Sequence, residues 1–558
     1  MRNRILFSGI AILIMGCSEI IAQTENWQWV TNTKSYWGMC NDMAVDSNGN
    51  IYIAGQFVFS DFDLLGINLI NHGDEDSYVA KFDNSGNIIW ARSFGGPDLD
   101  EIQAIDVDQN GNVYIAGYYE SPTLNFDAFT LINSGHYDVF ISKLDNSGNV
   151  LWAKSFGGTD YEIDFSVKCD LTGSIYITGY YLSSQLIIES FVFNNQGSND
   201  IFLIKYDTDG NLIWARSFGG QSGETSNDMS FDSYNNLYLT GRFWGDTMQF
   251  DAESIFNTTG YPKMFVTKFN PSGVAQWAKT CDNCTGYHWV SKICTDHNDN
   301  IYLGGTLSNN CNITIDNYSL INQGNDDIFL VKLNSSGGTL WAKNEGGINS
   351  ESLHDITVDH NNNLVMTGYV TSRNITIGPY ILTNQSDSAS DMGSYWNWKD
   401  FVIAQYASNG TVTWANIYGN RLDEEANELV SGPDGIIIAG EYESDTFNIG
   451  PFTVYDSSSV FTSMFVAKFS IEPNKVDLLT NRNNFSLYPN PNKGKFTVSY
   501  QTDMECYYEI YDLLGKQTCD KKSFRNSVQI DLSGKPKGMY ILKLYANKEI
   551  KVVKVLLQ

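Results

Sequence analysis

A repeat of about 62 residues is the feature that most constrains what this chain can fold into. Seven segments share one pattern around a glycine, at Gly55, Gly117, Gly179, Gly241, Gly305, Gly368 and Gly440. The intervals between these glycines are 62, 62, 62, 64, 63 and 72 residues. A second marker keeps the same phase, with tryptophan at Trp29, Trp90, Trp152, Trp214, Trp277, Trp341 and Trp414. A fixed period of tens of residues indicates repeated supersecondary units.

Each unit is predicted to contain four strands. In residues 102–156 they are IQAIDVD, VYIAGYY, DVFISKLD and VLWAKSF, with short turns at QNGN and NSGN and a long connection in the middle. The second strand is apolar or aromatic on both faces, as expected for a sheet covered on both sides. Four-stranded units packed around an axis are the blades of a propeller. The sequence therefore predicts an all-β fold, with a seven-bladed β-propeller over residues 24–470.

The chain enters and leaves the repeat out of phase. Trp29 belongs to a lone fourth strand before the first unit, and the last unit ends after its third strand near Phe469. We therefore expect the N-terminal strand to complete the seventh blade, which would remove the two open edges of the array.

The segments DNSGNIIWARSFGG, DQNGNVYIAGYY and GHYDVFISKLD resemble the SBBP family of bacterial β-propeller repeats. The resemblance covers roughly residues 26–470. It implies a fold more firmly than a function, because propellers carry many unrelated activities.

The first 22 residues have the layout of a secretory signal peptide, with Arg2 and Arg4 before an apolar run and small residues beyond. Two forms of processing are considered: release after Ala22, and lipid modification of Cys17. No other stretch approaches the roughly 20 apolar residues of a membrane helix, so none is expected in the mature protein.

A polar linker over residues 471–483 precedes a different kind of sequence at 484–558. Five or six short strands predict a small Ig-like β-sandwich. The segment also resembles the type A C-terminal sorting domain of the type IX secretion system. The residues that carry this resemblance are Tyr488, Pro489, Asn490, Pro491, Gly494, Gly515, Gly538 and Tyr540. It implies contact with the type IX secretion machinery, export across both membranes, and an extracellular or surface-attached product. An Ig-like ligand-binding module is the alternative.

The formal net charge of −29 is distributed unevenly. Residues 480–558 carry 13 Lys and Arg against 7 Asp and Glu, so the remainder of the chain is strongly acidic. That charge argues against nucleic acid as a partner of the large domain. It is interpreted as a solvated surface, with weak binding of divalent cations as the alternative.

The metal and disulfide candidates are few. Recurrent Asp-x-x-Gly-Asn turns are explained by Asx-type turns, and the six histidines are scattered over different repeat positions. Cys281 and Cys284 suggest a redox pair or half of a zinc site with Cys294 and Cys311, but Cys294 lies at the far end of a strand. No metal or cofactor is expected. Cys506 and Cys519 lie on either side of the Leu513–Leu514 turn, which predicts a cross-strand disulfide.

The best candidate binding surface is the face of the propeller that carries the long connections. The sixth unit is about ten residues longer there, through SDSASDMGSYWNWKD. Tyr395, Trp396 and Trp398 could stack on sugar rings or a partner protein, or could cover their own blade. We expect a non-enzymatic surface propeller that binds a glycan or a surface protein. The alternative is a secreted hydrolase or lyase that acts on polysaccharide at the same face.

Overall fold

The structure is a computed structural model. It describes residues 23–33, 38–283, 286–308, 311–386, 398–455, 462–473, 485–488, 493–500, 506–512, 516–546 and 549–557. The predicted signal peptide, Cys17, Ala22 and most of the predicted linker lie outside these residues. The chain divides into two compact units, of which one is Glu25–Ile471 and the other contains Glu472–Gln558.

The described part of Glu25–Ile471 contains seven four-stranded antiparallel sheets, named sheets 1 to 7 here. Sheet 1 has β2 (Gly38–Val45), β3 (Ile51–Val58), β6 (Glu75–Phe82) and β7 (Ile88–Phe94). Sheet 2 has β8 (Asp100–Val107), β9 (Val113–Tyr119), β12 (Asp138–Leu144) and β13 (Val150–Phe156). Sheet 3 has β14 (Glu162–Cys169), β15 (Ile175–Tyr181), β18 (Asp200–Tyr206) and β19 (Leu212–Phe218). Sheet 4 has β20 (Glu224–Phe231), β21 (Leu237–Phe243), β24 (Lys263–Phe269) and β25 (Ala275–Thr280).

The remaining three sheets repeat this order. Sheet 5 has β26 (His288–Thr295), β27 (Ile301–Ser308), β30 (Asp326–Leu333) and β31 (Thr339–Glu345). Sheet 6 has β32 (Glu351–Val358), β33 (Leu364–Val370), β36 (Asp400–Tyr406) and β37 (Val412–Tyr418). Sheet 7 has β38 (Glu424–Gly432), β39 (Gly435–Tyr442), β42 (Ser463–Pro473) and β1 (Gln23–Asn32).

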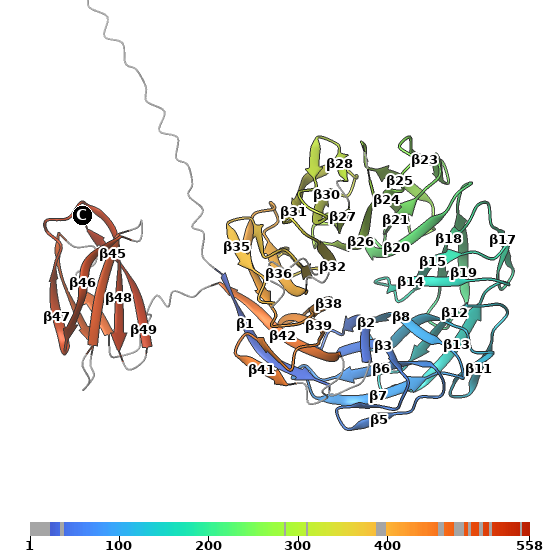
Figure 1. Cartoon of the computed structure of the whole chain (residues 1–558), viewed down its shortest axis with the longest axis horizontal. Coiled ribbons are helices and arrows are strands. Elements are labelled where there is room, and N and C mark those ends of the chain that lie inside the picture. The colour runs from blue at the N-terminus through green and yellow to red at the C-terminus, as the bar shows by residue number, and fades with distance from the viewer. Residues whose placement is uncertain are drawn as a thin grey trace, which may run out of the picture. The chain divides into compact units, whose positions relative to one another are not determined.

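The seven sheets lie around a central axis, with the first strand of each sheet nearest to it (Figure 1). These inner strands are β2, β8, β14, β20, β26, β32 and β38. Each inner strand has a register shift near its middle, for example between Cys40 and Asp42 in β2 and between Val290 and Lys292 in β26. A bulge adds one residue and redirects the following side chains. The bulges therefore set which side chains face the axis.

The long connection inside each unit, for which the sequence predicts a loop, contains a two-stranded hairpin. The hairpins pair β4 (Phe62–Leu64) with β5 (Ile67–Leu69), β10 (Thr123–Phe126) with β11 (Phe129–Ile132), β16 (Gln185–Ile188) with β17 (Phe191–Asn194), β22 (Thr247–Phe250) with β23 (Glu253–Phe256), β28 (Asn312–Ile315) with β29 (Tyr318–Ile321), β34 (Asn374–Ile377) with β35 (Tyr380–Thr383), and β40 (Thr446–Ile449) with β41 (Phe452–Tyr455). Leu124 and Phe126 of β10 are buried and alternate with exposed residues.

The hydrophobic core is built between neighbouring sheets. In one cluster, Tyr52 and Ala54 of sheet 1 pack with Ile102, Val113 and other apolar residues of sheet 2. Similar clusters join the other neighbours. Each sheet therefore buries both faces, which explains why its second strand is apolar on both sides.

Strand β1 lies beside β42 at the outer edge of sheet 7, the position that the phase of the repeat predicts. Trp27 is buried, and its Nε1 donates a hydrogen bond to the Tyr418 hydroxyl at 3.0 Å. The Glu25 carboxylate accepts hydrogen bonds from Trp414 Nε1 at 2.8 Å and Asn416 Nδ2 at 3.0 Å. The N-terminal strand is therefore joined to sheet 6 as well as sheet 7.

The C-terminal unit has two sheets that share one core. A three-stranded sheet contains β43 (Phe485–Tyr488), β44 (Lys495–Tyr500) and β47 (Asn526–Asp531). A four-stranded sheet contains β46 (Gln517–Phe524), β45 (Cys506–Asp512), β48 (Gly538–Ala546) and β49 (Glu549–Leu557). Phe496 and Ile530 of the first sheet pack with Tyr508, Leu542 and Val555 of the second.

Candidate functional site

The inner strands enclose a polar cavity of about 860 Å³ on the ring axis. Its lining comes from all seven sheets, from Asn41 of sheet 1 to Val430 of sheet 7. Ligand sites in proteins are commonly concave and of a few hundred to a thousand cubic ångströms. By volume and by its polar lining, this cavity is the main candidate for a binding site among the described residues.

Charged side chains follow five of the seven bulges of the inner strands. The residue that follows each bulge is Asp42, Ala104, Ser166, Asp228, Lys292, Asp355 or Glu428, from sheets 1 to 7 respectively. Lys292 Nζ lies 3.0 Å from Glu428 Oε2 and 3.7 Å from Asp355 Oδ1. This ion pair joins sheet 5 to sheets 6 and 7.

Two lysines stand among the carboxylates of the cavity. Burial alone would lower the pKa of Lys292, but the nearby Asp355 and Glu428 outweigh it and raise that pKa well above its usual value. The pKa of Lys168 is also raised, because Asp42, Asp106 and Asp228 outweigh the effect of its burial. Both lysines therefore stay charged at neutral pH and neutralise part of the carboxylate charge.

The carboxylates also join neighbouring sheets. Asp42 Oδ2 accepts a hydrogen bond from the Ile105 backbone N–H at 2.8 Å, and Asp228 Oδ2 accepts one from Ile293 N–H at 3.0 Å. Asp355 Oδ2 accepts the corresponding bond from Leu429 N–H at 2.7 Å. Hydrogen bonds to charged acceptors are stronger than neutral ones. The inner carboxylates therefore hold neighbouring sheets together. The side chains considered for ligand binding are those nearer the mouth of the cavity.

The mouth of the cavity on the long-connection face has an aromatic side. Tyr180, Arg242 and Trp289 line the cavity and come from sheets 3, 4 and 5. Arg242 Nε donates to Thr225 Oγ1 at 3.3 Å, and its guanidinium carbon lies 4.8 Å from the centre of the Trp244 ring. Burial lowers the pKa of Arg242, and Tyr180 opposes this shift.

The side of the mouth formed by sheets 2 and 7 is acidic, because Glu101 and Glu425 hold the strand position that Trp289 holds in sheet 5. The Tyr118 hydroxyl donates to Glu101, and the Tyr118 and Tyr137 rings stack with centroids 5.0 Å apart. Glu425 Oε1 accepts a hydrogen bond from Lys399 Nζ at 2.6 Å. Burial raises the pKa of Glu441 to about 7, and the neighbouring Glu425 and Glu443 add to the shift.

The predicted aromatic loop lies mostly outside the described residues. Tyr395 and Trp396 belong to residues 387–397, of which nothing is described. Trp398 is half-buried, and its carbonyl oxygen accepts a hydrogen bond from Asn384 Nδ2 at 3.2 Å. The next residue, Lys399, bonds to Glu425, so the end of this loop reaches the acidic side of the mouth. Sequence reasoning missed Tyr180, Arg242 and Trp289. An alignment of the seven units would have singled out Arg242 and Trp289, which differ from the residues at the equivalent positions, whereas Tyr180 recurs as Tyr118 and Tyr369.

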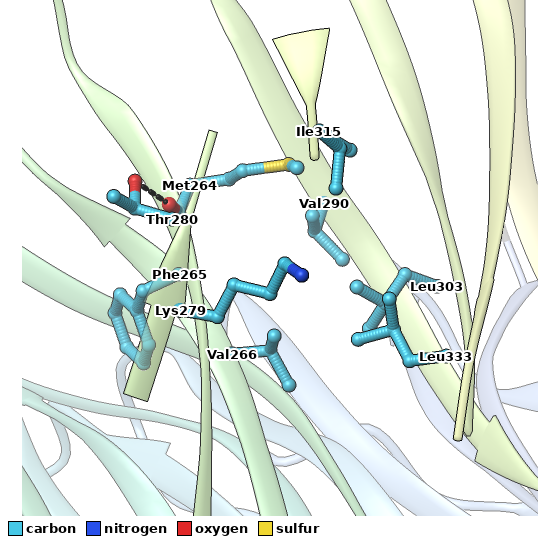
Figure 2. A pocket seen from close by; sticks show the side chains of 9 residues that line it. All are labelled: Met264, Phe265, Val266, Lys279, Thr280, Val290, Leu303, Ile315 and Leu333. Atoms are coloured by element: carbon cyan, nitrogen blue, oxygen red, sulfur yellow. Dashed lines mark hydrogen bonds between the residues drawn. The ribbon is translucent and has the colours of Figure 1, made fainter. Parts of the chain in front are cut away.

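A second, smaller pocket lies between sheets 4 and 5 (Figure 2). Seven of its nine lining residues are apolar, the other two being Lys279 and Thr280, and its volume is about 10 Å³. The hydrogen bond from Thr280 Oγ1 to the Met264 carbonyl spans 2.7 Å at its edge. Space for about one water molecule cannot hold a ligand.

Two of the candidate cysteines, Cys281 and Cys311, lie near His288. Cys281 Sγ lies 3.1 Å from His288 Nε2, and Cys311 Sγ lies 3.8 Å from His288 Nδ1. His288 Nε2 also accepts a hydrogen bond from the Met264 backbone N–H at 3.2 Å. Cys284 lies outside the described residues, and Cys294 lies near the other end of β26, opposite Tyr302. In the described part of the chain, no group of three or more His, Cys, Asp or Glu side chains is arranged to hold a metal ion.

The Asp-x-x-Gly-Asn turns use their carboxylates internally. Asp108 Oδ1 accepts the Asn110 and Asn112 backbone N–H groups at 2.8 and 2.9 Å. Its Oδ2 accepts Asn112 Nδ2 at 2.7 Å and the Tyr114 hydroxyl at 3.2 Å. Both oxygens are thus occupied by donors, which is the Asx-type arrangement.

The pairing predicted for Cys506 and Cys519 is wrong in register. Cys506 lies opposite Phe524, and Cys519 lies opposite Ile510. Tyr511 pairs with Gln517, which centres the hairpin on position 514. Cys506 lies eight residues before this position and Cys519 five residues after it, and two register shifts in β45 add to the offset. The offset of several residues exceeds the separation that a disulfide can span.

The residues of the sorting motif are spread over the C-terminal unit. Tyr488 is exposed at the end of β43, whereas Tyr540 is buried and its hydroxyl donates to the Pro536 carbonyl at 2.6 Å. The Gly494 carbonyl accepts the Leu532 N–H at 2.6 Å, and Gly538 begins β48 with φ 149°. Pro489, Asn490, Pro491 and Gly515 lie outside the described residues.

Comparison with protein families identifies both parts of the chain. Residues 486–558 match the secretion system C-terminal sorting domain, and residues 39–56 and 89–118 match the beta-propeller repeat called SBBP. The chain combines β-propeller repeats with a type IX sorting domain. Both predicted resemblances are therefore confirmed. The sorting domain indicates export by type IX secretion to the extracellular space or the outer surface of the cell.

The curated relatives are distant. An uncharacterized WD repeat-containing protein, L264 of Acanthamoeba polyphaga mimivirus, is 24% identical over 476 residues, which cover 70% of this chain. The regulatory protein FlaEY of Caulobacter vibrioides is 29% identical over 115 residues, or 20% of this chain. The matches span only 33% and 12% of the lengths of these two relatives.

Solved structures with similar chains include YCF48 bound to D1 peptide, with TM-score 0.33 and 8% identity, covering 82% of this chain and 100% of that one. The Pan2 WD40 domain of Neurospora crassa has TM-score 0.28 and 11% identity, covering 62% and 92% of the two chains. A duf4221 family member from Bacteroides vulgatus has TM-score 0.31 and 10% identity, covering 81% and 99%. The described residues contain no helix long and apolar enough to cross a membrane.

Proposed function

We propose that residues 25–471 form a closed seven-bladed propeller that binds a carbohydrate of the cell surface or surroundings at the long-connection mouth of its central cavity. The C-terminal unit is an Ig-like sandwich that delivers the propeller through contacts with the type IX secretion machinery. Its motif at Tyr488–Pro491, Gly494, Gly515, Gly538 and Tyr540 is the surface proposed for those contacts.

The observation that carries the binding proposal is the composition of the mouth. Tyr180, Arg242 and Trp289 line a cavity of about 860 Å³. Glu101 and Glu425 hold the same strand position as Trp289 in sheets 2 and 7, just outside the cavity lining. Sugars present apolar ring faces and many hydroxyl groups. Aromatic rings offer a flat apolar surface, while carboxylates and guanidinium groups accept and donate hydrogen bonds. Tyr395, Trp396 and Trp398 are proposed to extend this surface.

Binding is favoured over hydrolysis because the mouth carboxylates are already engaged. Glu101 accepts the Tyr118 hydroxyl, and Glu425 is paired with Lys399 and lies 3.5 Å from His354 Nε2. Glycoside hydrolysis uses two carboxyl groups that flank the scissile bond, one to donate a proton and one to act as base or nucleophile. Carboxylates held by partners are better suited to fixed hydrogen bonds.

The test is a glycan array followed by calorimetric titration of the full chain. We expect Tyr180→Ala and Arg242→Ala each to lower the affinity about tenfold or more, because about 1.4 kcal/mol of lost contact corresponds to a factor of ten.

Tyr234→Ala is the matched control. Tyr234 belongs to the same repeat as Arg242 but is 74% exposed on the short-turn face, away from the mouth. Its substitution should leave affinity unchanged. Absence of any glycan binding by the native chain, or equal loss in all three variants, would contradict the proposal.

A further inference from the structure

Pairs of buried carboxyl groups recur where one sheet meets the next on the long-connection side. The first member is the first or second residue of the third strand of a sheet, and the second member is the first residue of the inner strand of the following sheet. The five pairs are Asp76 with Asp100, Asp138 with Glu162, Asp200 with Glu224, Asp327 with Glu351, and Asp400 with Glu424. All ten side chains are no more than 1% exposed.

The backbone holds the two members of a pair side by side. Tyr137 and Tyr161 form an isolated parallel β-bridge, and the same bridge joins Glu75 to Leu99, Asn199 to Gly223, and Asp326 to Ser350. Each bridged residue directly precedes one member of a pair. The Glu162 N–H donates to the Tyr137 carbonyl at 2.9 Å. Residues that follow bridged positions on neighbouring strands have adjacent side chains.

One oxygen of each first carboxyl group lacks a hydrogen-bond donor among the described residues. This atom is Oδ1 of Asp76, Asp138, Asp200, Asp327 and Asp400. In the third pair, Glu224 Oε1 also lacks a donor. The other oxygen is satisfied by a backbone N–H, for example Ser134 N–H to Asp138 Oδ2 at 2.9 Å. A buried carboxyl oxygen without a donor is costly unless a proton or an ion supplies the missing bond.

The unsatisfied oxygens lie against glycine. A methyl group at Gly157 would lie 2.1 Å from Asp138 Oδ1 and 3.0 Å from Glu162 Oε2, so the two carboxyl groups converge there. Gly95, Gly219, Gly346 and Gly419 hold the same position beside Asp76, Asp200, Asp327 and Asp400. These are the first glycines of the repeated GG segments or their equivalents.

The two members of a pair are present or absent together in the seven junctions of the ring. Between sheets 4 and 5 the positions hold Lys263 and His288, and between sheets 7 and 1 they hold Ser463 and Gly38. No described junction has one carboxyl group without the other. Isolated buried charges would not produce this pattern, because two like charges repel each other.

We propose that each of these five junctions holds one proton shared between the two carboxyl groups, so that a carboxyl–carboxylate hydrogen bond joins the adjacent sheets. The proton supplies the missing donor to Oδ1 and removes one of the two charges. A cation is disfavoured because the second carboxyl group also faces N–H donors, such as Gly158 N–H at 2.7 Å from Glu162 Oε2. This proposal is independent of the carbohydrate-binding proposal.

The pKa values of the second members support this geometry. Burial raises the pKa of Asp100, Glu162, Glu224 and Glu424 to about 7, and the first carboxyl group of the pair adds to the shift. Burial also raises the pKa of Asp400 to about 7. Other titratable or charged groups that face the pairs are His72 at Asp76, Tyr119 at Asp100 and Asp138, Tyr181 at Glu162 and Asp200, Asp326 at Asp327, and Arg373 and Asp423 at Asp400.

The test is the pH dependence of thermal unfolding in the full chain with three amide substitutions, Glu162→Gln, Glu224→Gln and Glu351→Gln. A glutamine NH₂ group donates to Oδ1 at every pH, whereas the native pair loses its proton as the pH rises. We expect the fall in melting temperature between about pH 5 and about pH 8 to shrink by about half, since three of the five carboxyl pairs no longer lose a shared proton.

Glu189→Gln is the control, because Glu189 is on an exposed hairpin turn and pairs with Lys154. It should leave the pH profile unchanged. Should the triple variant fail to fold, Asp138→Asn tests one carboxyl pair alone. It should reduce the decrease of melting temperature with pH. The infrared C=O stretch of protonated carboxyl groups should also weaken in the variants. An unchanged slope, or calcium stabilisation after chelator treatment that the variants lose, would overturn the proposal.

Discussion

The repeated tryptophans and the repeated turn glycines contact one another across sheet boundaries. The Trp90 indole N–H donates to the Asn146 carbonyl of the next sheet at 3.1 Å, and Trp152 donates to Thr208 at 3.3 Å. Gly148 follows Asn146 by two residues in the same turn, lies against the Trp90 ring and has a φ of 85°. The tryptophan of one unit and the turn glycine of the next unit are thus two halves of one contact, which recurs around the ring.

Two glycines of sheet 4 separate the contribution of this contact from backbone strain. Gly273 has φ 75°, and a methyl group there would lie 2.9 Å from the Trp214 ring. Gly260 has φ 74° and open space around it. Both Gly→Ala variants incur the strain of positive φ, about 1 kcal/mol, but only Gly273→Ala overpacks an indole, which adds about 1–3 kcal/mol. Denaturant unfolding should therefore show Gly273→Ala to be the less stable variant, and equal losses would argue against the contact.

At the scale of elements, the sequence predicts most strands but not the polar interior. The strands of the four-stranded sheets stand out because each is long, apolar and repeated. The outer hairpins were missed because their strands are three or four residues long. The pair Lys292–Glu428 joins positions 136 residues apart. A carboxylate follows the bulge in four units, but a lysine follows it in sheet 5 alone. Periodicity reveals what recurs, so a contact made once around the ring leaves no signal in it.

Strand β1 is the element whose loss should matter most, because it belongs to sheet 7 but comes from the other end of the repeat. The Trp27 ring packs 4.7 Å from Phe469 and 5.4 Å from Tyr418 between ring centres. Truncation of a buried tryptophan costs about 3–5 kcal/mol. We expect Trp27→Ala to lower the free energy of unfolding by that amount. The neighbouring Gln28 is exposed, so Gln28→Ala should stay within about 0.5 kcal/mol of the native chain. Similar stability of the two variants would refute closure by β1.

At the scale of the whole molecule, many buried carboxyl groups make stability depend on pH. Burial raises the pKa of Glu75 and Glu345 to about 7, as it does for Glu162 and Glu441. In the unfolded chain these groups have pKa values near 4. Between about pH 4 and about pH 7 the folded state therefore binds more protons than the unfolded state, so its stability falls as the pH rises. The contribution is complete below about pH 4 and is lost through about pH 7.

Groups with lowered pKa act in a different range. Hydrogen bonds from Asn87 and Ser85 outweigh partial desolvation and lower the pKa of Asp83, so its contribution is lost only as the pH falls below its ordinary value. Because the buried carboxyl groups with raised pKa lose their protons in this range, the melting temperature should decrease by at least about 5 °C from about pH 5 to about pH 8. Scanning calorimetry at about 0.5 M salt, where surface charges are largely screened, should retain most of this decrease. A melting temperature that rises over this range, or a decrease that disappears in salt, would assign the effect to net surface charge instead of to the buried carboxyl groups between the sheets.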